Sequence, residues 1–523
     1  MSLLQNWFEN YVFIFWLATF LCLLGFGGVI VRHGNFVNTV PPVPDGRFRC
    51  MKRKWYQALM LSNPVGSLVQ TGYKVITKVA EKPFVVRYWG KPYVILPAKP
   101  EYLSDMRKAD RAHLSFIDNM SDLFFLYNWV KDLFTSERMV YVIIRGLNPN
   151  LPYLTDAVIN EADYAFKAQF GDCKEATSFP AFPTLMNLSI RMGARVILGD
   201  GFCRNEPFIA EVENYFNWNF ITGVIALKLP LGPFRDTLGW PLWRLQQWRL
   251  SKTIAKLSPY VQMRIDQEKS NKHDATKIDG LSGMIKILKT NPVEDNVTPP
   301  LWRITHEMIQ LLWAAGHSPG SALTQMVFSI LEHTSYLPIL RKEAEEAIAL
   351  YGWTEKAFSK LPVQDSYIRE VNRLYPTFSL NATRTVMKVP FTFSDGLTLP
   401  VGTRIALPAQ AIQRDSEFCR DPLEFDGFRF IKLAQADARQ DDGVNIWAAS
   451  NSGKTNLSFG YGNHACPGRF LAVRMLKVVF TKLILEYDVS WDRADPGQPS
   501  RFSMEGISTP NVTQNVKLKK RVL

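Results

Sequence analysis

Paired cysteines, long low-complexity tracts and nucleic-acid-binding motifs are all missing from this 523-residue sequence. Its six cysteines lie without paired spacing, which argues against a disulfide framework and for a reducing compartment. An acidic excess is also missing, since 61 Lys and Arg against 48 Asp and Glu give a formal net charge of +13. Because no motif favours nucleic acid, we expect the charge to serve an anionic membrane or an acidic protein partner.

Long linkers are absent from residues 60–523. With 47% hydrophobic and 13% aromatic residues, the chain can bury a large core. Length alone would allow two or more domains, but the unbroken composition predicts one large domain.

Charge is absent from residues 11–31, which are long enough as a helix to cross a hydrocarbon core of about 30 Å. A cleaved signal peptide is the alternative, but the apolar run is too long and Glu9 stands where a basic residue is expected. Basic residues follow within residues 32–59, so the positive-inside rule places residues 1–10 in the lumen and the domain in the cytosol. Consecutive prolines make residues 32–59 a basic, stiff hinge.

A glycine-rich loop precedes the last long apolar segment and carries a single cysteine, Cys466. A cysteine at the start of a helix faces unpaired backbone N–H groups and the positive end of the helix dipole, so we expect a thiolate that could bind iron. Gly462 and Gly468 carry no Cβ, so a flat cofactor could approach closely. A buried structural cysteine in a glycine turn is the alternative.

The pattern F-x-x-G-x-x-x-C-x-G is complete as Phe459, Gly462, Cys466 and Gly468, and it resembles the haem-thiolate signature of the cytochrome P-450 family. The resemblance implies haem b with Cys466 as the axial iron ligand, a ligation that favours O–O cleavage. His464 replaces the arginine that is more common in the family, and it would be a weaker or pH-dependent partner of a haem propionate.

The resemblance also implies a mainly α fold, a large helical domain with a small β-region, preceded here by the transmembrane helix. Residues 84–89 and 93–96 read as a β-hairpin, the first part of that β-region. From residue 101 to about 288 the apolar periodicity predicts mostly helix.

Glu370 and Arg373 stand at i and i+3, where an acid and a base on one helix face can pair. Alone, such a pair is usually a solvated surface contact. Here it resembles the family's E-x-x-R element, which implies a bracing network completed by Arg429. The same resemblance places Arg384 as a propionate ligand and lines the pocket with Leu380 and Asn381, among residues 379–382.

A long amphipathic helix is expected over residues 301–331, and the resemblance implies that it crosses the distal face of the haem. Where the family has an acid–alcohol pair that relays protons, this chain has His317 and Ser318, which can both carry protons. Pro319 predicts a kink or bulge. An ordinary proline kink without a relay is the alternative.

Weaker patterns predict further residues of the substrate pocket, the membrane contact and the partner surface. Aromatic residues such as Phe116 and Phe124 are either core or part of a substrate-recognition loop. Residues 218–234 would cover the pocket entrance and touch the membrane. The resemblance also gives pocket residues Trp313, Ala314 and Ala315 and propionate ligand Arg145. The basic residues Lys454, Arg469, Arg474 and Lys477 could form a surface for an acidic electron donor, and scattered solvated charges are the alternative.

The segments Gly462–Phe470 and Cys203–Glu206 look like those of filamentous-fungal secondary-metabolism members of the family. The resemblance implies an enzyme of the endoplasmic reticulum membrane that takes electrons from NADPH through a cytochrome reductase, with cytochrome b5 as a second candidate donor. It would insert one oxygen of O₂ into an apolar terpenoid, indole alkaloid or polyketide. A haem-thiolate enzyme without net oxygen insertion, and a membrane haem protein that only binds a ligand, are the alternatives.

Overall fold

The computed structural model describes residues 49–50, 65–88, 91–110, 112–123, 137–228, 239–270, 277–292, 299–436, 446–493, 498–504 and 506–522. The predicted membrane span, most of the hinge, and Phe124 lie outside these ranges. Within them, none of the helices combines the length and the apolar character needed to cross a bilayer.

Helices dominate the described chain, which confirms the mainly α prediction. The longer ones are α3 (Val65–Gly72), α5 (Pro100–Lys108), α6 (Phe116–Leu123), α8 (Leu151–Phe170), α9 (Ala181–Leu198), α10 (Glu206–Lys228), α12 (Trp240–Lys269), α13 (Gly280–Leu288), α14 (Pro300–Glu332), α15 (Tyr336–Tyr351), α17 (Pro362–Leu374), α19 (Arg429–Ala436) and α20 (Arg469–Glu486). Short helical pieces are η1 (Tyr73–Thr77), α4 (Lys78–Ala80), α7 (Arg138–Tyr141), η2 (Val142–Leu147), η3 (Asn148–Asn150), α16 (Glu355–Ser359), α18 (Ala409–Gln413) and η6 (Gly462–His464).

The main sheet has the order β1-β2-β3-β9-β6-β4. Its strands are β1 (Arg49–Cys50), β2 (Phe84–Tyr88), β3 (Lys91–Ile95), β9 (Arg404–Leu407), β6 (Asn381–Val386) and β4 (Leu114–Ser115). The predicted hairpin is present, with Phe84 paired to Ile95. Three smaller sheets contain β5 (Thr177–Pro180), β10 (Tyr487–Asp492) and β13 (Asn515–Lys520); β11 (Arg501–Met504) and β12 (Ile507–Pro510); and β7 (Phe391–Thr392) and β8 (Thr398–Leu399).

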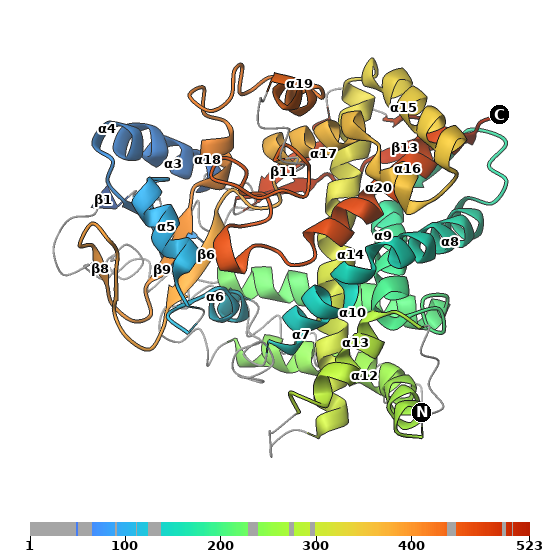
Figure 1. The fold of residues 1–523 in the computed structure, drawn as a ribbon, viewed down its shortest axis with the longest axis horizontal. Helices are drawn as coiled ribbons and strands as arrows, with labels where there is room; N and C mark the ends of the chain where they lie inside the picture. Colours follow the sequence, from blue (N-terminus) through green and yellow to red (C-terminus); the bar gives the residue numbers. More distant parts are fainter. Residues whose placement is uncertain are drawn as a thin grey trace, which may run out of the picture.

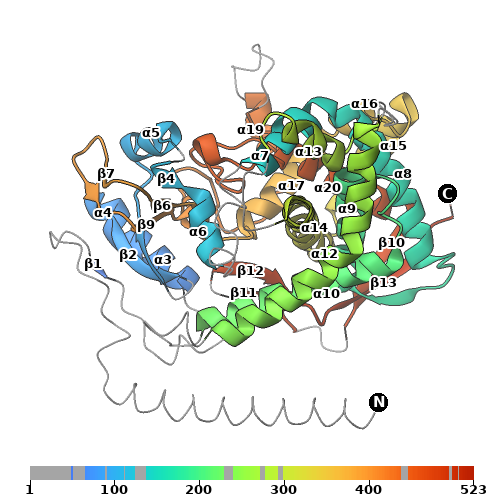
Figure 2. The same ribbon diagram turned by 90° about the horizontal axis from the view of Figure 1, so that it is seen from below.

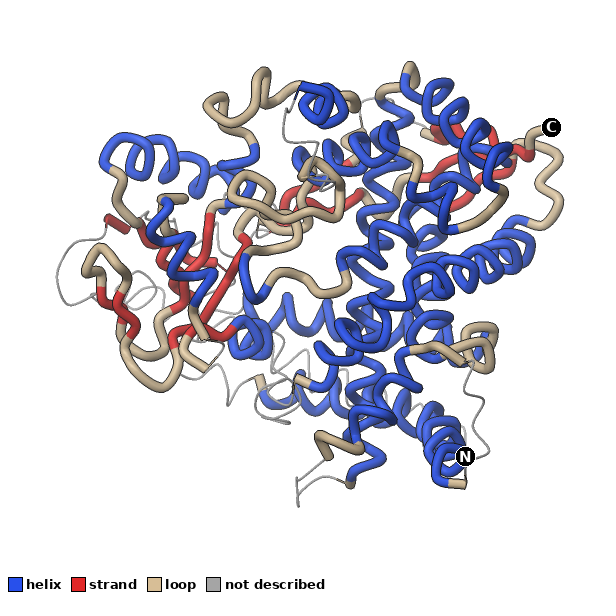
Figure 3. Tube along the Cα trace, viewed as in Figure 1, coloured by secondary structure: helices blue, strands red, loops and turns tan. Residues whose placement is uncertain are grey.

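The main sheet lies at one end of the molecule and the helices fill the other (Figures 1 and 3). In Figure 2, α14 is seen nearly end-on at the centre, and it packs against α9, α12, α17 and α20. The bounds of α14 match the predicted 301–331 closely. Outside its centre, the apolar residues of the helix are buried on almost every side. The helix stays α-helical on both sides of Pro319, and the kink angle there remains a prediction.

α9 and α14 approach one another unusually closely because small residues face each other. A Cβ on Gly316 would lie 2.8 Å from Ile190 Cγ1, and a Cβ on Gly193 would lie 3.2 Å from the carbonyl carbon of Ala315. Ser189 Oγ donates to the Gly316 carbonyl oxygen at 2.7 Å. The centre of α14 is therefore held against α9 by backbone contact.

Candidate active site

Cys466 lies between η6 and α20, in the loop whose turn is set by glycine. Its N–H donates to the Phe459 carbonyl oxygen at 2.8 Å. Gly462 has φ of +68°, and a Cβ there would lie 2.7 Å from Arg107 Cα, so a larger residue is excluded both by conformation and by space. The carbonyl oxygen of the next residue, Pro467, accepts from Asn148 Nδ2 at 3.0 Å, which ties the loop to η3.

The environment of the Cys466 thiol differs from the prediction. Burial raises its pKa, and this effect outweighs the backbone N–H groups of Gly468 and Arg469 and the Arg469 charge, which lower it. The start of the helix therefore does not make a thiolate unaided. A thiol that coordinates a metal ion is deprotonated outright, so we assign the thiolate to the metal-bound state.

The centre of α14 is its accessible part. Positions 303–312 and 319–321 are buried, whereas Ala314 and Ser318 are exposed and Trp313, Ala315 and His317 are partly so. The exposed pair is one helical turn apart on a single face. Phe459, Trp313 and Ala315 all pack against the same main core cluster, so the cysteine loop and the centre of α14 both lie against the helical core.

Glu370 is fully buried, and the structure brings together the three predicted members of the network around it. Arg373 donates to both carboxylate oxygens at 2.7 and 2.8 Å, and Arg429 Nε lies 3.2 Å from each. Both arginines also donate to backbone carbonyls of residues 413–424, including that of Glu424 at 3.1 and 3.0 Å. The pair is therefore a buried hub for the loop before α19 and not a solvated surface contact.

A bulge in β6 carries two predicted residues to the cysteine loop. The pairing of β6 with β9 shifts between Asn381 and Arg384, and Ala382 has φ of +52°. Asn381 Nδ2 donates to the Ser458 carbonyl oxygen at 3.2 Å, and Arg384 Nη2 donates to that of Tyr461 at 3.0 Å. The bulge thus docks the strand onto the residues that precede Cys466.

The other predicted site residues are distributed around this loop. The Arg384 guanidinium lies 5.9 Å from the ring centre of Phe116, and Leu380 is buried in the apolar cluster of β2 and β3. Arg145 is exposed on η2, stacked 4.4 Å over Tyr141. His464 is partly buried in η6.

These residues fit a haem. Cys466 keeps accessible surface although it is deep enough for burial to raise its pKa, so it faces an internal space. A Cβ on Gly468 would meet no protein atom within 4 Å, which leaves room for a flat group beside the sulfur. Cys466 would hold the iron, and Arg384, Arg145 and His464 would serve the propionates.

Two residues of the predicted basic surface are not available to a partner. Arg474 Nη2 lies 2.6 Å from Glu355 Oε1, and Lys477 Nζ lies 2.9 Å from Asp365 Oδ1, with both cations largely buried. The prediction was wrong for these two because α20 is covered along almost its whole length and does not present a polar face. Lys454 is exposed and Arg469 partly so.

The sequence reading missed a second buried charge cluster. Arg138 donates through Nε to Glu307 Oε2 at 3.0 Å and is 3% exposed, while Arg303 Nε lies 3.5 Å from Glu307 Oε1. Two charges at i and i+4 in an otherwise apolar helix are the signal that could have found it, because a buried charge needs a partner.

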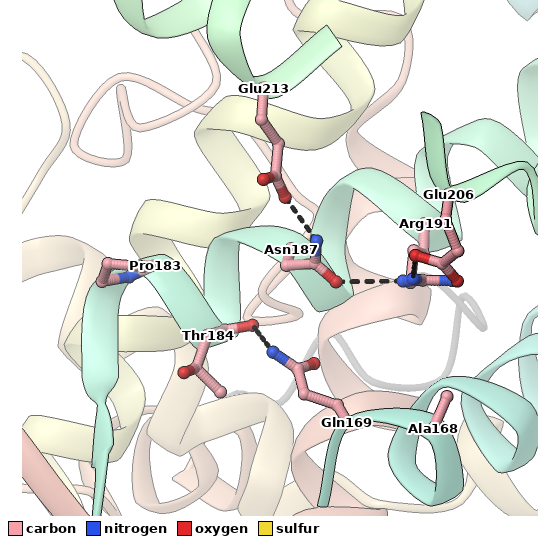
Figure 4. Close-up of a pocket in the computed structure, with 8 residues that line it drawn as sticks. All are labelled: Ala168, Gln169, Pro183, Thr184, Asn187, Arg191, Glu206 and Glu213. Atoms are coloured by element: carbon pink, nitrogen blue, oxygen red, sulfur yellow. Dashed lines mark hydrogen bonds and ion pairs between the residues drawn. The ribbon is translucent and has the colours of Figure 1, made fainter. Parts of the chain in front are cut away.

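A polar pocket of about 360 Å³ lies between α8, α9 and α10, on the face of α9 turned away from α14 (Figure 4). Asn187 Nδ2 donates to Glu213, Arg191 Nε donates to Asn187 Oδ1 at 2.9 Å, and Arg191 pairs with Glu206. Glu206 ends the fungal-like segment Cys203–Glu206, whose Arg204 Nε donates to the buried Glu161 at 2.9 Å. That segment is therefore a structural junction, outside the active site.

A long helix with an accessible centre, a cysteine set in a glycine loop and a buried glutamate hub together define the class of haem-thiolate proteins. Residues 150–518 match the family model described as Cytochrome P450. The chain belongs to the cytochrome P450 family, and it is a haem-dependent monooxygenase that receives electrons from NADPH through a reductase.

Named relatives support this. The chain is 34% identical over 453 residues to cytochrome P450 monooxygenase sirB of Leptosphaeria maculans, covering 86% of this chain and 85% of that one. It is 28% identical over 467 residues to ent-kaurene oxidase of Gibberella intermedia, covering 88% and 84%. It is 29% identical over 388 residues to cytochrome P450 monooxygenase paxP of Penicillium paxilli, covering 72% of each. The structure of retinoic acid-bound cyanobacterial CYP120A1 has the same fold, with TM-score 0.62, 19% identity, and coverage of 88% and 96%.

Proposed function

We propose that this enzyme hydroxylates or epoxidises an apolar terpenoid, indole alkaloid or polyketide in a fungal biosynthetic pathway. The observation that carries the proposal is the accessible stretch of α14, which is made of small and aromatic residues and packs against the same core cluster as Phe459 of the cysteine loop. Similarity to an ent-kaurene oxidase and to paxP supports an apolar, multi-ring substrate. Haem supplies the oxidising chemistry when bound, and the chain orients the substrate and excludes water.

We assign the proton relay to the Ser318 hydroxyl. It lies with Ala314 on the exposed face of α14, and its Oγ has no hydrogen-bond partner among the described residues, so it is free to bond to water or substrate. His317 lies on another face, and its assignment to the relay remains a prediction that this geometry does not support.

Reconstitution with a cytochrome P450 reductase, NADPH and isotopically labelled O₂ tests the function. Products of a terpenoid, indole and polyketide panel should carry one labelled oxygen, and the Ser318→Ala variant should consume NADPH with roughly 10-fold less product per electron pair, whereas Ser318→Thr should retain product formation. A product without label would favour the alternative of coupling, rearrangement or dehydration. Unchanged coupling in Ser318→Ala would remove the relay assignment.

We also propose attachment to the endoplasmic reticulum through residues 11–31, with α10 and α12 facing the lipid. Trp218, Trp240 and Trp248 are exposed on these helices, and Arg249 and Lys252 stack on Trp248 at 5.0 and 3.6 Å. Exposed tryptophans beside cations suit the headgroup layer. The full chain should sediment with microsomes after alkaline carbonate washing, and a chain lacking residues 1–31 should be released by it.

Cytochrome b5 remains a candidate second donor, and Lys454 and Arg469 remain candidates for contact with an acidic partner. Charge-reversal variants at these two positions should weaken reductase binding, and the effect should shrink at high salt.

A further inference from the structure

His317 differs from the other histidine of the same helix in a way that indicates a binding role. His306 is 1% exposed, and its Nε2 accepts a hydrogen bond from Gln310 at 3.0 Å. His317 is partly accessible, and among the residues that the structure describes neither of its ring nitrogens has a hydrogen-bond partner. Gln310 therefore holds His306 within the core, while Nδ1 of His306 has no partner among the described residues.

The described neighbours of His317 are aromatic, and no charged group among the described residues shifts the pKa of its imidazole. Its ring centre lies 6.3 Å from that of Trp313, one turn earlier in α14, and 5.9 Å from that of Phe220 in α10. Phe220 in turn packs against the apolar cluster that contains Leu380 and Ile507. A single polar ring thus stands in an apolar wall that spans α14 and α10 and continues towards β6 and β12.

Burial also keeps this imidazole neutral, since it lowers the pKa of His317 to about 4. A neutral imidazole presents one N–H donor and one nitrogen acceptor. It therefore matches an alcohol, which can use both, or a ketone, which uses the donor. It does not neutralise a carboxylate or an ammonium group, which would be costly to bring into such surroundings.

We infer that His317 is the hydrogen-bonding anchor for one oxygen atom of an otherwise apolar, multi-ring substrate. The inference rests on the proposed function, and it narrows the substrate class to molecules that already carry an alcohol or ketone when they reach this enzyme. The reaction that supplies the substrate is then one that installs or retains such an oxygen. His317 fixes the orientation of the substrate, and Ser318 on the neighbouring face of α14 transfers protons.

Binding can be measured without turnover by titrating the purified, haem-loaded full chain and following the substrate-induced shift of its absorption spectrum. We would use two matched series, androstane with androstanol and androstanone, and indane with indanol and indanone. In at least one series the alcohol or ketone should bind about 10-fold more tightly than its hydrocarbon, because the anchor is left unpaired by the hydrocarbon.

Three variants give the matched control. His317→Phe keeps the aromatic wall and should abolish the preference for the oxygen-bearing compound, while His317→Gln keeps a donor and an acceptor and should preserve most of it. Trp313→Phe changes an aromatic neighbour of the anchor and leaves the imidazole itself in place, so it should shift the affinity of all members of a series together. The ferrous-carbonyl spectrum and the melting temperature check that each variant is folded and loaded.

Equal affinity for hydrocarbon, alcohol and ketone in the unmodified protein would overturn the inference, as would a preference that survives in His317→Phe or a failure of every oxygen-bearing compound to bind. The proposed function fails separately. Selective binding without NADPH-dependent product would leave the anchor in place and remove the oxygenation, whereas oxygenated products with no alcohol or ketone preference would do the reverse.

Discussion

The two sides of the cysteine loop differ in how their polar groups are satisfied. On the support side, which is the hub around Glu370, Arg373 and Arg429 both donate to the Glu370 carboxylate and to backbone carbonyls. At the opening in the centre of α14, His317 and Ser318 have no hydrogen-bond partner among the described residues. The support side is complete within the chain, whereas the opening leaves its polar atoms to molecules that the chain does not contain. Four predictions test that contrast.

The largest effect should come from the ligand itself. Cys466→Ser removes the soft sulfur, so the thiolate-type spectrum of the ferrous carbonyl complex and NADPH-dependent product should both be lost. Circular dichroism should stay native, because Cys466 holds the loop through its backbone N–H to Phe459, which serine retains. A thiolate spectrum that survives in this variant would move the iron ligand elsewhere.

Among these variants, breaking the hub around Glu370 should cause the largest loss in the free energy of unfolding. Glu370→Gln leaves Arg373 and Arg429 without their carboxylate, and removing one partner of a buried pair costs about 3–5 kcal/mol. Denaturant unfolding would measure it. The control is Glu346→Gln, which removes an exposed pair with Lys342 at 3.9 Å and should change stability by less than about 0.5 kcal/mol. Similar values for the two variants would refute the hub.

Substitutions in the centre of α14 should have little effect on stability except where the helix contacts α9. Gly316→Ala places a Cβ 2.8 Å from Ile190 Cγ1 and 3.1 Å from its Cα, so a loss of roughly 1–3 kcal/mol is expected from overpacking. Gly283 in α13 is the matched control, since its Cβ would meet only ordinary contacts from 3.6 Å. Gly283→Ala should be neutral or stabilising by up to about 1 kcal/mol, and the reverse order would contradict the close contact.

The smallest effect is on the pH dependence of stability, and it concerns Glu343, which bonds to the start of α17, the helix that carries Glu370. Burial raises the pKa of Glu343 to about 7, although its carboxylate accepts the N–H groups of Val363 and Gln364 at the start of α17. Because the folded-state pKa is raised, its contribution to stability is complete below the unfolded value near 4.5 and is lost as the pH rises through about 7.

Relative to Glu343→Gln, the unmodified protein should therefore lose about 1–2 kcal/mol between pH 5 and 8. Chemical denaturation of both proteins at a series of pH values would measure the difference. A gap that widens in favour of the unmodified protein at high pH would show that ionised Glu343 is stabilised by its two N–H donors.

The family resemblance supplied the role of the Cys466 loop and the partner Arg429, which is far from Glu370 in sequence. Local spacing was enough to predict the pair of Glu370 with Arg373, the length of α14 and the hairpin at Phe84, because each depends on residues close in sequence or on one apolar pattern. It could not predict the burial of Arg474 and Lys477, which depends on what packs around α20. Nor could it show that burial outweighs the helix start at Cys466. Both failures concern desolvation, which is a property of the assembled fold.

The backbone contact between α9 and α14 limits how this enzyme could be re-engineered. Since Gly193, Gly316 and Ser189 leave no slack between the two helices, a roomier cavity cannot be obtained by moving α14 outward. Variation in the compounds accepted must then come from the α10 part of the apolar wall, where Phe220 approaches His317 through its side-chain ring. A library aimed at new substrates should begin at that phenylalanine.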